Sequence, residues 1–162
     1  MPELVYLYGK TEEVIALTVP CLVTAQSCLY ARARDVSEED LFLVGQWDTG
    51  ATKTAISKST IKALGVNPTG RKIKVRGVNG VYESDTYLID LYLPDGFVFK
   101  DLLVTEMNDE SEPPVLIGLD VILQSDFMVG SKDGRVLLKF RYPSEGDKPF
   151  TAEPIPLFQE EN

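Results

Sequence analysis

The stretch that decides the fold is Leu43–Ser57, which reads LVGQWDTGATKTAIS. An apolar run reaches Trp47, and the acid Asp48 follows at the point where a buried strand would end. The sequence Thr-Gly-Ala then turns the chain into a segment of small and β-branched residues. A carboxylate in apolar surroundings is costly unless another group shares its charge or its proton. The rest of the sequence therefore has to supply a group that stands beside Asp48.

The composition limits the chemistry that is available. The chain has 162 residues, enough for one domain with a real core, and 44% hydrophobic with 25% charged residues is typical of globular proteins. It has no histidine and only two cysteines. This excludes Ser-His and Cys-His nucleophilic schemes and nearly every zinc site. Any catalysis has to use carboxylates, lysine, tyrosine or hydroxyl groups.

The charge and the apolar runs indicate a soluble protein. A net charge of −9 argues against nucleic-acid binding, which needs a basic face. The longest apolar runs, such as VPCLV, are far too short to cross a bilayer. The first residues show no basic segment leading into an apolar one, so we expect a cytoplasmic protein without a signal peptide. Cys21 and Cys28 are then expected as buried free thiols rather than a disulfide.

Short strands dominate the expected secondary structure. Alternating and β-branched runs predict strands at 3–8, 14–23, 41–47, 73–75, 81–92, 97–105, 115–118, 127–129 and 135–140. Turns are expected at Gly9-Lys10 and Asp133-Gly134. Short helices are expected at 59–64, with Ser57 or Ser59 as the N-cap, and at 119–124. Strands with only two brief helices predict an all-β barrel or sandwich.

Two segments together resemble the retropepsin-like aspartic proteases: WDTGAT at 47–52 and VLIGLD at 115–120. In that family a hydrophobic strand ends in Asp-Thr/Ser-Gly-Ala. A glycine-containing flap hairpin follows, and then an apolar-apolar-Gly segment that leads into a short helix. All three features occur here in that order, and the wider pattern is similar to that of the bacterial and cellular single-domain members. The resemblance extends from about Leu41 to Ser144.

The resemblance implies a fold and a domain plan. The expected fold is an all-β, retropepsin-like closed β-barrel with a flap hairpin and one or two short helices, which forms half of a two-fold dimer. Residues 1–142 would form one domain, with extra N-terminal strands in 1–40 and the core in 41–142. Residues 143–162, rich in proline and acidic residues, would form a tail or an extended arm.

The resemblance also implies an activity, that of an aspartic endopeptidase. Two carboxylates that share one proton can take a proton from water and give one to the scissile amide. This chain has one Asp-Thr-Gly-Ala and is too short for two lobes, so the second Asp48 would come from an identical subunit. The implied partners are therefore a second copy and an extended peptide or protein substrate. No metal and no organic cofactor is implied.

The active-site loop would have three supporting residues beside the catalytic Asp48. Thr49 would direct its hydroxyl across the two-fold axis to the backbone of the partner, a role carried over from the family. Gly50 would let the chain turn sharply and bring N–H groups near the carboxylate. Ala51 would line the floor of the cleft, where a larger side chain would obstruct the substrate.

The flap would cover an extended substrate from the other side. Gly77, Val78, Asn79 and Gly80 form its expected tip, with the glycines allowing it to open and close. The substrate would lie between flap and floor as an added strand. Gly118 belongs to the apolar turn that would pack beneath the active-site loop.

Other conspicuous residues have plainer interpretations. Trp47 is expected in the core, and Asp120 as a cap or ion-pair partner of the short helix rather than an acid that supports the site. Asp90, like Asp85 and Asp101, is expected on a solvated strand or turn.

One departure from the family is clear. Retroviral enzymes commonly have an Asp–Arg pair where this chain has Thr52 and Leu119, so that supporting ion pair is absent here. Two alternatives stay open. The dimer would bind peptides without hydrolysing them, or the chain would stay monomeric until a partner or a processing event brings two copies together.

Overall fold

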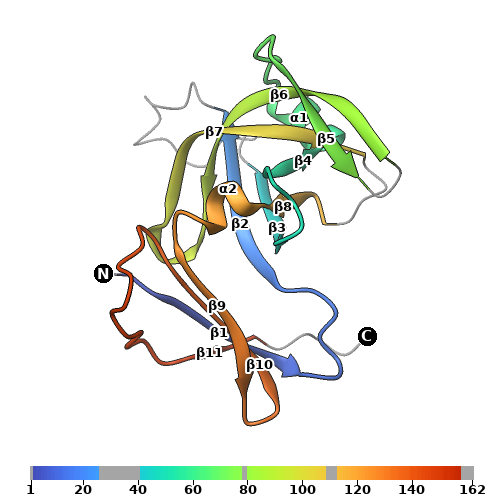
Figure 1. Cartoon of the computed structure of the whole chain (residues 1–162). Coiled ribbons are helices and arrows are strands. Elements are labelled where there is room, and N and C mark those ends of the chain that lie inside the picture. The colour runs from blue at the N-terminus through green and yellow to red at the C-terminus, as the bar shows by residue number, and fades with distance from the viewer. Residues whose placement is uncertain (1, 26–40, 78–79, 109–112, 158–162) are drawn as a thin grey trace.

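The computed structural model describes residues 2–25, 41–77, 80–108 and 113–157. Strands make up most of these residues, which confirms the all-β prediction (Figure 1). The elements, in chain order, are β1 (Leu4–Lys10), β2 (Thr18–Ala25), β3 (Leu41–Trp47), β4 (Ala55–Ser57), α1 (Lys58–Leu64), β5 (Lys72–Gly77), β6 (Gly80–Tyr92), the 3₁₀ turn η2 (Pro94–Gly96), β7 (Val98–Met107), β8 (Val115–Ile117), α2 (Leu119–Ile122), β9 (Asp126–Lys132), β10 (Arg135–Arg141) and β11 (Ile155–Pro156). Among the described residues, no helix has the length and apolar character needed to cross a membrane.

The larger sheet carries the candidate site. Its strand order is β2-β3-β8-β4-β7-β6-β5, and an additional pairing of β2 with β6 closes six of these strands into a ring. Strands β3 and β8 run parallel, with Trp47 opposite Ile117, while β8 pairs antiparallel with β4. The segments WDTGAT and VLIGLD therefore begin from neighbouring strands.

The smaller sheet has the order β11-β1-β10-β9 and lies beside the ring (Figure 1). Strand β1 is paired on both sides, antiparallel with β10 and parallel with the short β11. The N-terminal part of the chain thus contributes one strand to each sheet, since β2 belongs to the ring. The expected hairpin turn at Asp133-Gly134 joins β9 to β10, with both residues at positive φ.

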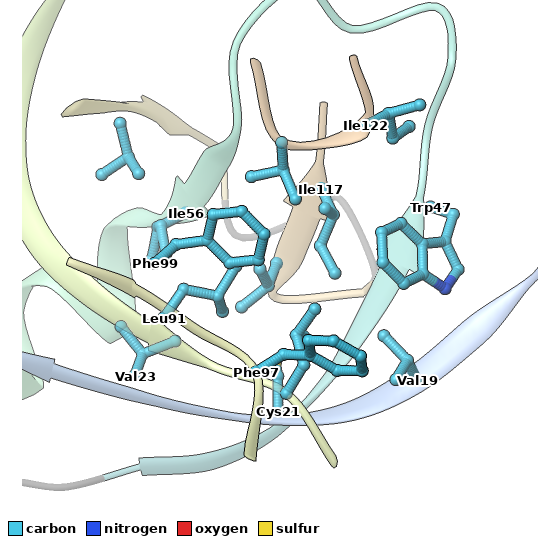
Figure 2. Packing of buried hydrophobic residues seen from close by; sticks show 14 of the residues in the cluster. Val19, Cys21, Val23, Trp47, Ile56, Leu91, Phe97, Phe99, Ile117 and Ile122 are labelled. Atoms are coloured by element: carbon cyan, nitrogen blue, oxygen red, sulfur yellow. The ribbon is translucent and has the colours of Figure 1, made fainter. Parts of the chain in front are cut away.

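One hydrophobic core cluster joins buried side chains of the ring and of the smaller sheet. Trp47 is 5% exposed, as expected for a core residue, and its ring centroid lies 5.2 Å from that of Phe127 and 4.9 Å from that of Phe140. Figure 2 shows Trp47 packed among apolar side chains of the ring, with Ile117 on one side. Cys21 is a buried free thiol, as predicted, and Cys28 lies outside the described residues.

A buried arginine fastens the C-terminal segment to the smaller sheet. The Arg141 side chain is 1% exposed, and its guanidinium lies 2.6 Å from Asp126 and 3.2 Å from Glu3. It also donates to the carbonyls of Lys148 and Pro149. The Ser144 hydroxyl, the Glu145 N–H group and the Arg141 guanidinium hold the pKa of Asp126 well below its ordinary value. Residues 143–157 therefore pack against β1 and β10 through charged and polar contacts.

Two local expectations were wrong. Gly9 and Lys10 lie in β1 rather than in a turn, because the pairing with β10 continues as far as Lys10, opposite Arg135. Asp90 is not solvated but 1% exposed. It accepts hydrogen bonds from the Asp101 backbone and the Lys100 ammonium group across a bulge between β6 and β7.

The first helix follows its sequence signals. The Ser57 side chain accepts a hydrogen bond from the Thr60 N–H group, and Gly65 adopts a left-handed conformation at φ 66°. The N-cap is thus Ser57 rather than Ser59, and the helix ends where glycine permits the turn.

Candidate active site

The loop Asp48–Ala51 continues directly from β3 and is anchored by its backbone. The Asp48 N–H group donates to the Ile117 carbonyl at 2.9 Å, which extends the parallel pairing of β3 and β8 by one residue. The Ala51 N–H group then donates back to the Asp48 carbonyl at 3.2 Å. The acid therefore stands at a fixed position at the end of β3, a strand whose Phe42 and Val44 side chains are exposed and whose Trp47 is buried.

Among the described residues, the carboxylate of Asp48 has one hydrogen-bond partner. Its Oδ1 atom accepts a hydrogen bond from the Gly50 N–H group at 2.8 Å, and the side chain is half-buried. A Cβ atom at Gly50 would lie 3.1 Å from that same oxygen. Gly50 is not in the left-handed region, so glycine serves here for close approach to the carboxylate rather than for an unusual turn.

Gly118 lies directly beneath this loop. A Cβ atom there would meet the Lys53 carbonyl carbon at 2.7 Å and the Ala51 carbonyl oxygen at 2.8 Å. The next residue, Leu119, donates its N–H group to the same Ala51 oxygen at 2.8 Å. The backbone of VLIGLD thus supports the backbone of DTGAT with no space for a side chain between them.

Asp120 and Thr54 clamp the same two segments together. The Asp120 carboxylate accepts hydrogen bonds from the Thr54 N–H group at 3.0 Å and from the Thr54 hydroxyl at 2.8 Å. That hydroxyl in turn accepts from the Gly118 N–H group at 3.1 Å. Asp120 also accepts a hydrogen bond from the Val121 N–H group at 3.1 Å in the first turn of α2, as the expected cap would, although the N-cap position itself is Gly118. In the described part of the chain Asp120 forms no ion pair, so the other expected role is not seen there.

This clamp joins the same two segments that carry Thr52 and Leu119, the positions at which the sequence departs from the family pattern. The available sequence signal was the simultaneous loss of charge at Thr52 and Leu119, but it does not say which residues take over. Thr54 and Asp120 are 66 positions apart, and each is an ordinary residue in its local context.

The expected flap hairpin is formed by β5 and β6. Its last described pair is Gly77 opposite Gly80, and Gly80 has a φ of 114°. Val78 and Asn79, the expected tip, lie outside the described residues. The two arms are largely exposed, as expected for a hairpin that extends beyond the core.

A hollow of about 620 Å³ lies between this hairpin and the end of β7. Its walls include Gly77, Gly80 and Tyr82 of this hairpin, and the acid Glu106. Glu106 accepts a hydrogen bond from the Tyr87 hydroxyl at 3.1 Å, and burial together with this carboxylate raises the pKa of Tyr87 to about 12.

Asp48 is not among the residues that line the hollow. Thr49, the next residue after Asp48, is exposed. The Thr49 hydroxyl has no hydrogen-bond partner in the described part of the chain. Within the same residues, no group of three or more histidine, cysteine, aspartate or glutamate side chains is placed to hold a metal ion. A single copy therefore presents an acid, a flap and a hollow, but not one enclosed cleft around the acid.

Comparison with known proteins places this arrangement in a family. Residues 42–124, which include the loop, the flap and the supporting turn, match the family model described as "gag-polyprotein putative aspartyl protease". No curated protein sequence matches the chain.

Solved structures give a similar picture. The crystal structure of a retropepsin-like aspartic protease from Rickettsia conorii has a TM-score of 0.50 at 11% identity, with 85% of this chain and 90% of that chain covered. EIAV protease complexed with the inhibitor HBY-793 has a TM-score of 0.46 at 20% identity, covering 71% of this chain and 91% of that one. The retroviral protease-like domain of Ddi1 from Leishmania major has a TM-score of 0.40 at 20% identity, covering 76% and 94%. The Rickettsia structure shows the shared fold.

Proposed function

The chain belongs to the gag-polyprotein aspartyl protease family and has the retropepsin-like fold, and from this premise we propose that it is an aspartic endopeptidase that acts as a homodimer. The observation that carries the proposal is the state of Asp48. Its backbone is fixed by Ile117, its loop is supported by Gly118, and its carboxylate accepts a single local hydrogen bond.

The chemistry needs two such carboxylates. Like charges about 3 Å apart cannot both be ionised, so two Asp48 side chains would share one proton and titrate as a pair. The ionised carboxylate accepts a proton from water, the water oxygen bonds to the scissile carbonyl carbon, and the protonated carboxylic acid gives its proton to the carbonyl oxygen. Transfer of a proton to the amide nitrogen then allows the C–N bond to break. No step needs a group from outside the dimer other than water and the peptide.

The surrounding residues take supporting roles in this proposal. The hydroxyl of Thr49, which has no partner among the described residues, would bond to the backbone of the other subunit, and Ala51 would form the floor beneath the peptide. The flap residues Gly77–Gly80 would close over the peptide from the opposite side. Residues 1–142 would act as one catalytic domain in the cytoplasm, with 143–162 as an arm.

The direct test compares two substitutions of aspartate by asparagine. Wild type, Asp48→Asn and the control Asp133→Asn are incubated with a peptide library between pH 4 and 7, and cleavage products are identified by mass spectrometry. Asp133 lies in an exposed turn at φ 53°, a conformation that asparagine also adopts readily. We expect cleavage by wild type and by Asp133→Asn, and a loss of at least about 10³-fold in Asp48→Asn.

Two results would contradict the proposal. Cleavage that survives in Asp48→Asn would show that another group does the chemistry. A wild-type dimer that binds the peptides and leaves them intact would make the protein a peptide-binding module instead.

A further inference from the structure

One large apolar side chain stands almost fully in solvent on an otherwise packed segment. Ile15, between β1 and β2, is 96% exposed, whereas its neighbours Val14 and Leu17 pack against the core. The segment is held in place at both ends. The Val14 N–H group donates to the Lys10 carbonyl at 3.2 Å, and the Leu17 carbonyl accepts from the Trp47 N–H group at 2.9 Å. Ile15 is therefore presented to solvent by a bonded backbone.

A hollow of about 280 Å³ lies beside Ile15. Its walls are the segment 14–17 together with Gln46, Trp47 and Val136. The Trp47 side chain is 95% buried, yet its indole nitrogen has no hydrogen-bond partner among the residues that the structure describes. In Figure 2 this nitrogen is on the side of the ring turned away from Ile117. A buried N–H group without a partner is unfavourable and requires an explanation.

The hollow is lined by the residue that directly precedes Asp48. Trp47 directly precedes Asp48, and consecutive Cα atoms are about 3.8 Å apart. In the proposed dimer the two Asp48 carboxylates approach to about 3 Å across the two-fold axis. The segment bonded to Trp47 is therefore also brought close to that axis in both copies.

A second copy also needs more contact area than the Asp48 loops provide. Specific dimers bury roughly 1,000 Å² or more in total. The edge of β1 that faces away from β10 is partly taken up by β11 of the same chain, at Tyr6 and Leu7. Each copy carries a net charge of −9, so contacts close to the axis have to avoid like charges. The sequence Val-Ile-Ala-Leu at 14–17 carries no charge.

From these observations we infer that the segment 14–17 is a subunit contact of the homodimer, in which Ile15 of each copy occupies the hollow beside Trp47 of the other. The contact is isologous, and it gives the buried indole N–H group access to an acceptor on the partner. The inference rests on the proposed function, because it takes the meeting of two Asp48 side chains as its starting point.

The test measures the dimer dissociation constant by sedimentation for wild type, Ile15→Asp and Phe42→Asp. Phe42 is the matched control, since it is 73% exposed on β3 and does not line the hollow. Two isoleucines are lost from the contact in Ile15→Asp and two charges are introduced, so we expect the dissociation constant to rise by about 100-fold or more. We expect Phe42→Asp to stay within about threefold of wild type.

The outcomes separate this inference from the proposed function. A wild-type dimer that Ile15→Asp leaves intact overturns the inference and leaves the protease proposal standing. A dimer that depends on Ile15 but cleaves no peptide supports the contact and contradicts the protease. A wild-type chain that remains monomeric while it cleaves peptides overturns both.

Trp47 supplies a second readout because it is the single tryptophan of the chain. Its emission should change with protein concentration over the same range as the sedimentation transition, and Ile15→Asp should retain the monomer spectrum throughout. Emission that stays constant while wild type dimerises would overturn the placement of the contact at the hollow. The wild-type part of this readout does not depend on the variant.

Discussion

Asp126 and Asp48 are both partly buried acids at the end of a structural element, but the chain treats them in opposite ways. Asp126 accepts hydrogen bonds from the Arg141 guanidinium, the Ser144 hydroxyl and the Glu145 backbone. Asp48 accepts one, from Gly50. The smaller sheet thus satisfies Asp126 within one chain, whereas the loop that carries Asp48 gives its acid one bond among the described residues. An acid with a fixed backbone and few hydrogen bonds keeps its remaining acceptor sites available for a partner subunit and a substrate.

Among the substitutions considered, removal of Arg141 should lower the stability of the protein most, because Arg141 is the centre of the ion-pair network in the smaller sheet. Arg141→Met leaves Glu3 and Asp126 without their shared cation in a buried setting. We expect the midpoint of thermal unfolding to fall by at least about 5 °C, measured by circular dichroism. Lys139→Met, which removes a half-buried cation from the same strand, is the control and should change the midpoint little. Equal midpoints for the two variants would show that the Arg141 network contributes nothing particular.

Gly118→Ala tests the support beneath the active-site loop. The added Cβ would stand 2.7–2.8 Å from backbone atoms of Ala51 and Lys53, which cannot yield as a flexible side chain does. We expect a loss of about 1–3 kcal/mol in the free energy of unfolding, from urea titration, together with a loss of cleavage.

The matched control for this substitution is Gly130→Ala. A Cβ at Gly130 would meet nothing within 4 Å, and the residue lies in β9 far from the loop in sequence. The control should keep wild-type stability to within about 0.5 kcal/mol. If Gly118→Ala is equally harmless, the close packing of the two segments is not required.

Asp120→Ala removes the clamp between the same segments. The Thr54 N–H and hydroxyl groups lose their acceptor, and Thr54 is fully buried. We expect a loss of about 1–3 kcal/mol in unfolding free energy and a lower kcat, because the loop would no longer hold Asp48 in one position. Asp120→Asn retains one acceptor oxygen and should recover part of both quantities. Full kcat in Asp120→Ala would show that the clamp does not position Asp48.

Low pH should reduce the stability that Asp126 contributes to the smaller sheet. Its pKa is lowered in the folded chain, so its contribution is complete above the unfolded value of about 4 and is lost as the pH falls toward the lower native pKa. The pKa of Glu3 is lowered too, chiefly by the Ala152 N–H group, so protonation of Glu3 at low pH also reduces stability. The difference in thermal midpoint between wild type and Asp126→Asn should therefore shrink between pH 7 and pH 3. A difference that is constant with pH would contradict this assignment.

The sequence predicts those features that are decided locally. The strand 41–47, the helix cap at Ser57 and the Asp-Gly turn at 133–134 all follow from patterns within a few residues. The features that were missed depend on distant pairing. Lys10 is in a strand because Arg135 lies opposite it, and Asp90 is buried because Lys100 reaches it across a bulge.

The candidate site shows the same division. The order of DTGA, flap and VLIGLD predicted that these segments meet, and the structure brings the first and last together. The clamp between Thr54 and Asp120 was not predictable, because neither residue is unusual where it stands and the contact spans 66 positions. The hollow beside Ile15 likewise exists only once β10 packs near the start of β2.

The central claim is that Asp48 is half of a site that a second copy completes, and subunit mixing tests it most directly. Asp48→Asn is added in increasing amounts to a fixed amount of wild type, at concentrations where the dimer forms, and the initial rate of peptide cleavage is measured. If subunits exchange at random, an equal amount of the variant should lower the rate to about one half and a ninefold excess to about one tenth, provided that mixed dimers are inactive. A rate that stays at the wild-type value at every ratio would show that one chain is sufficient and would contradict the account.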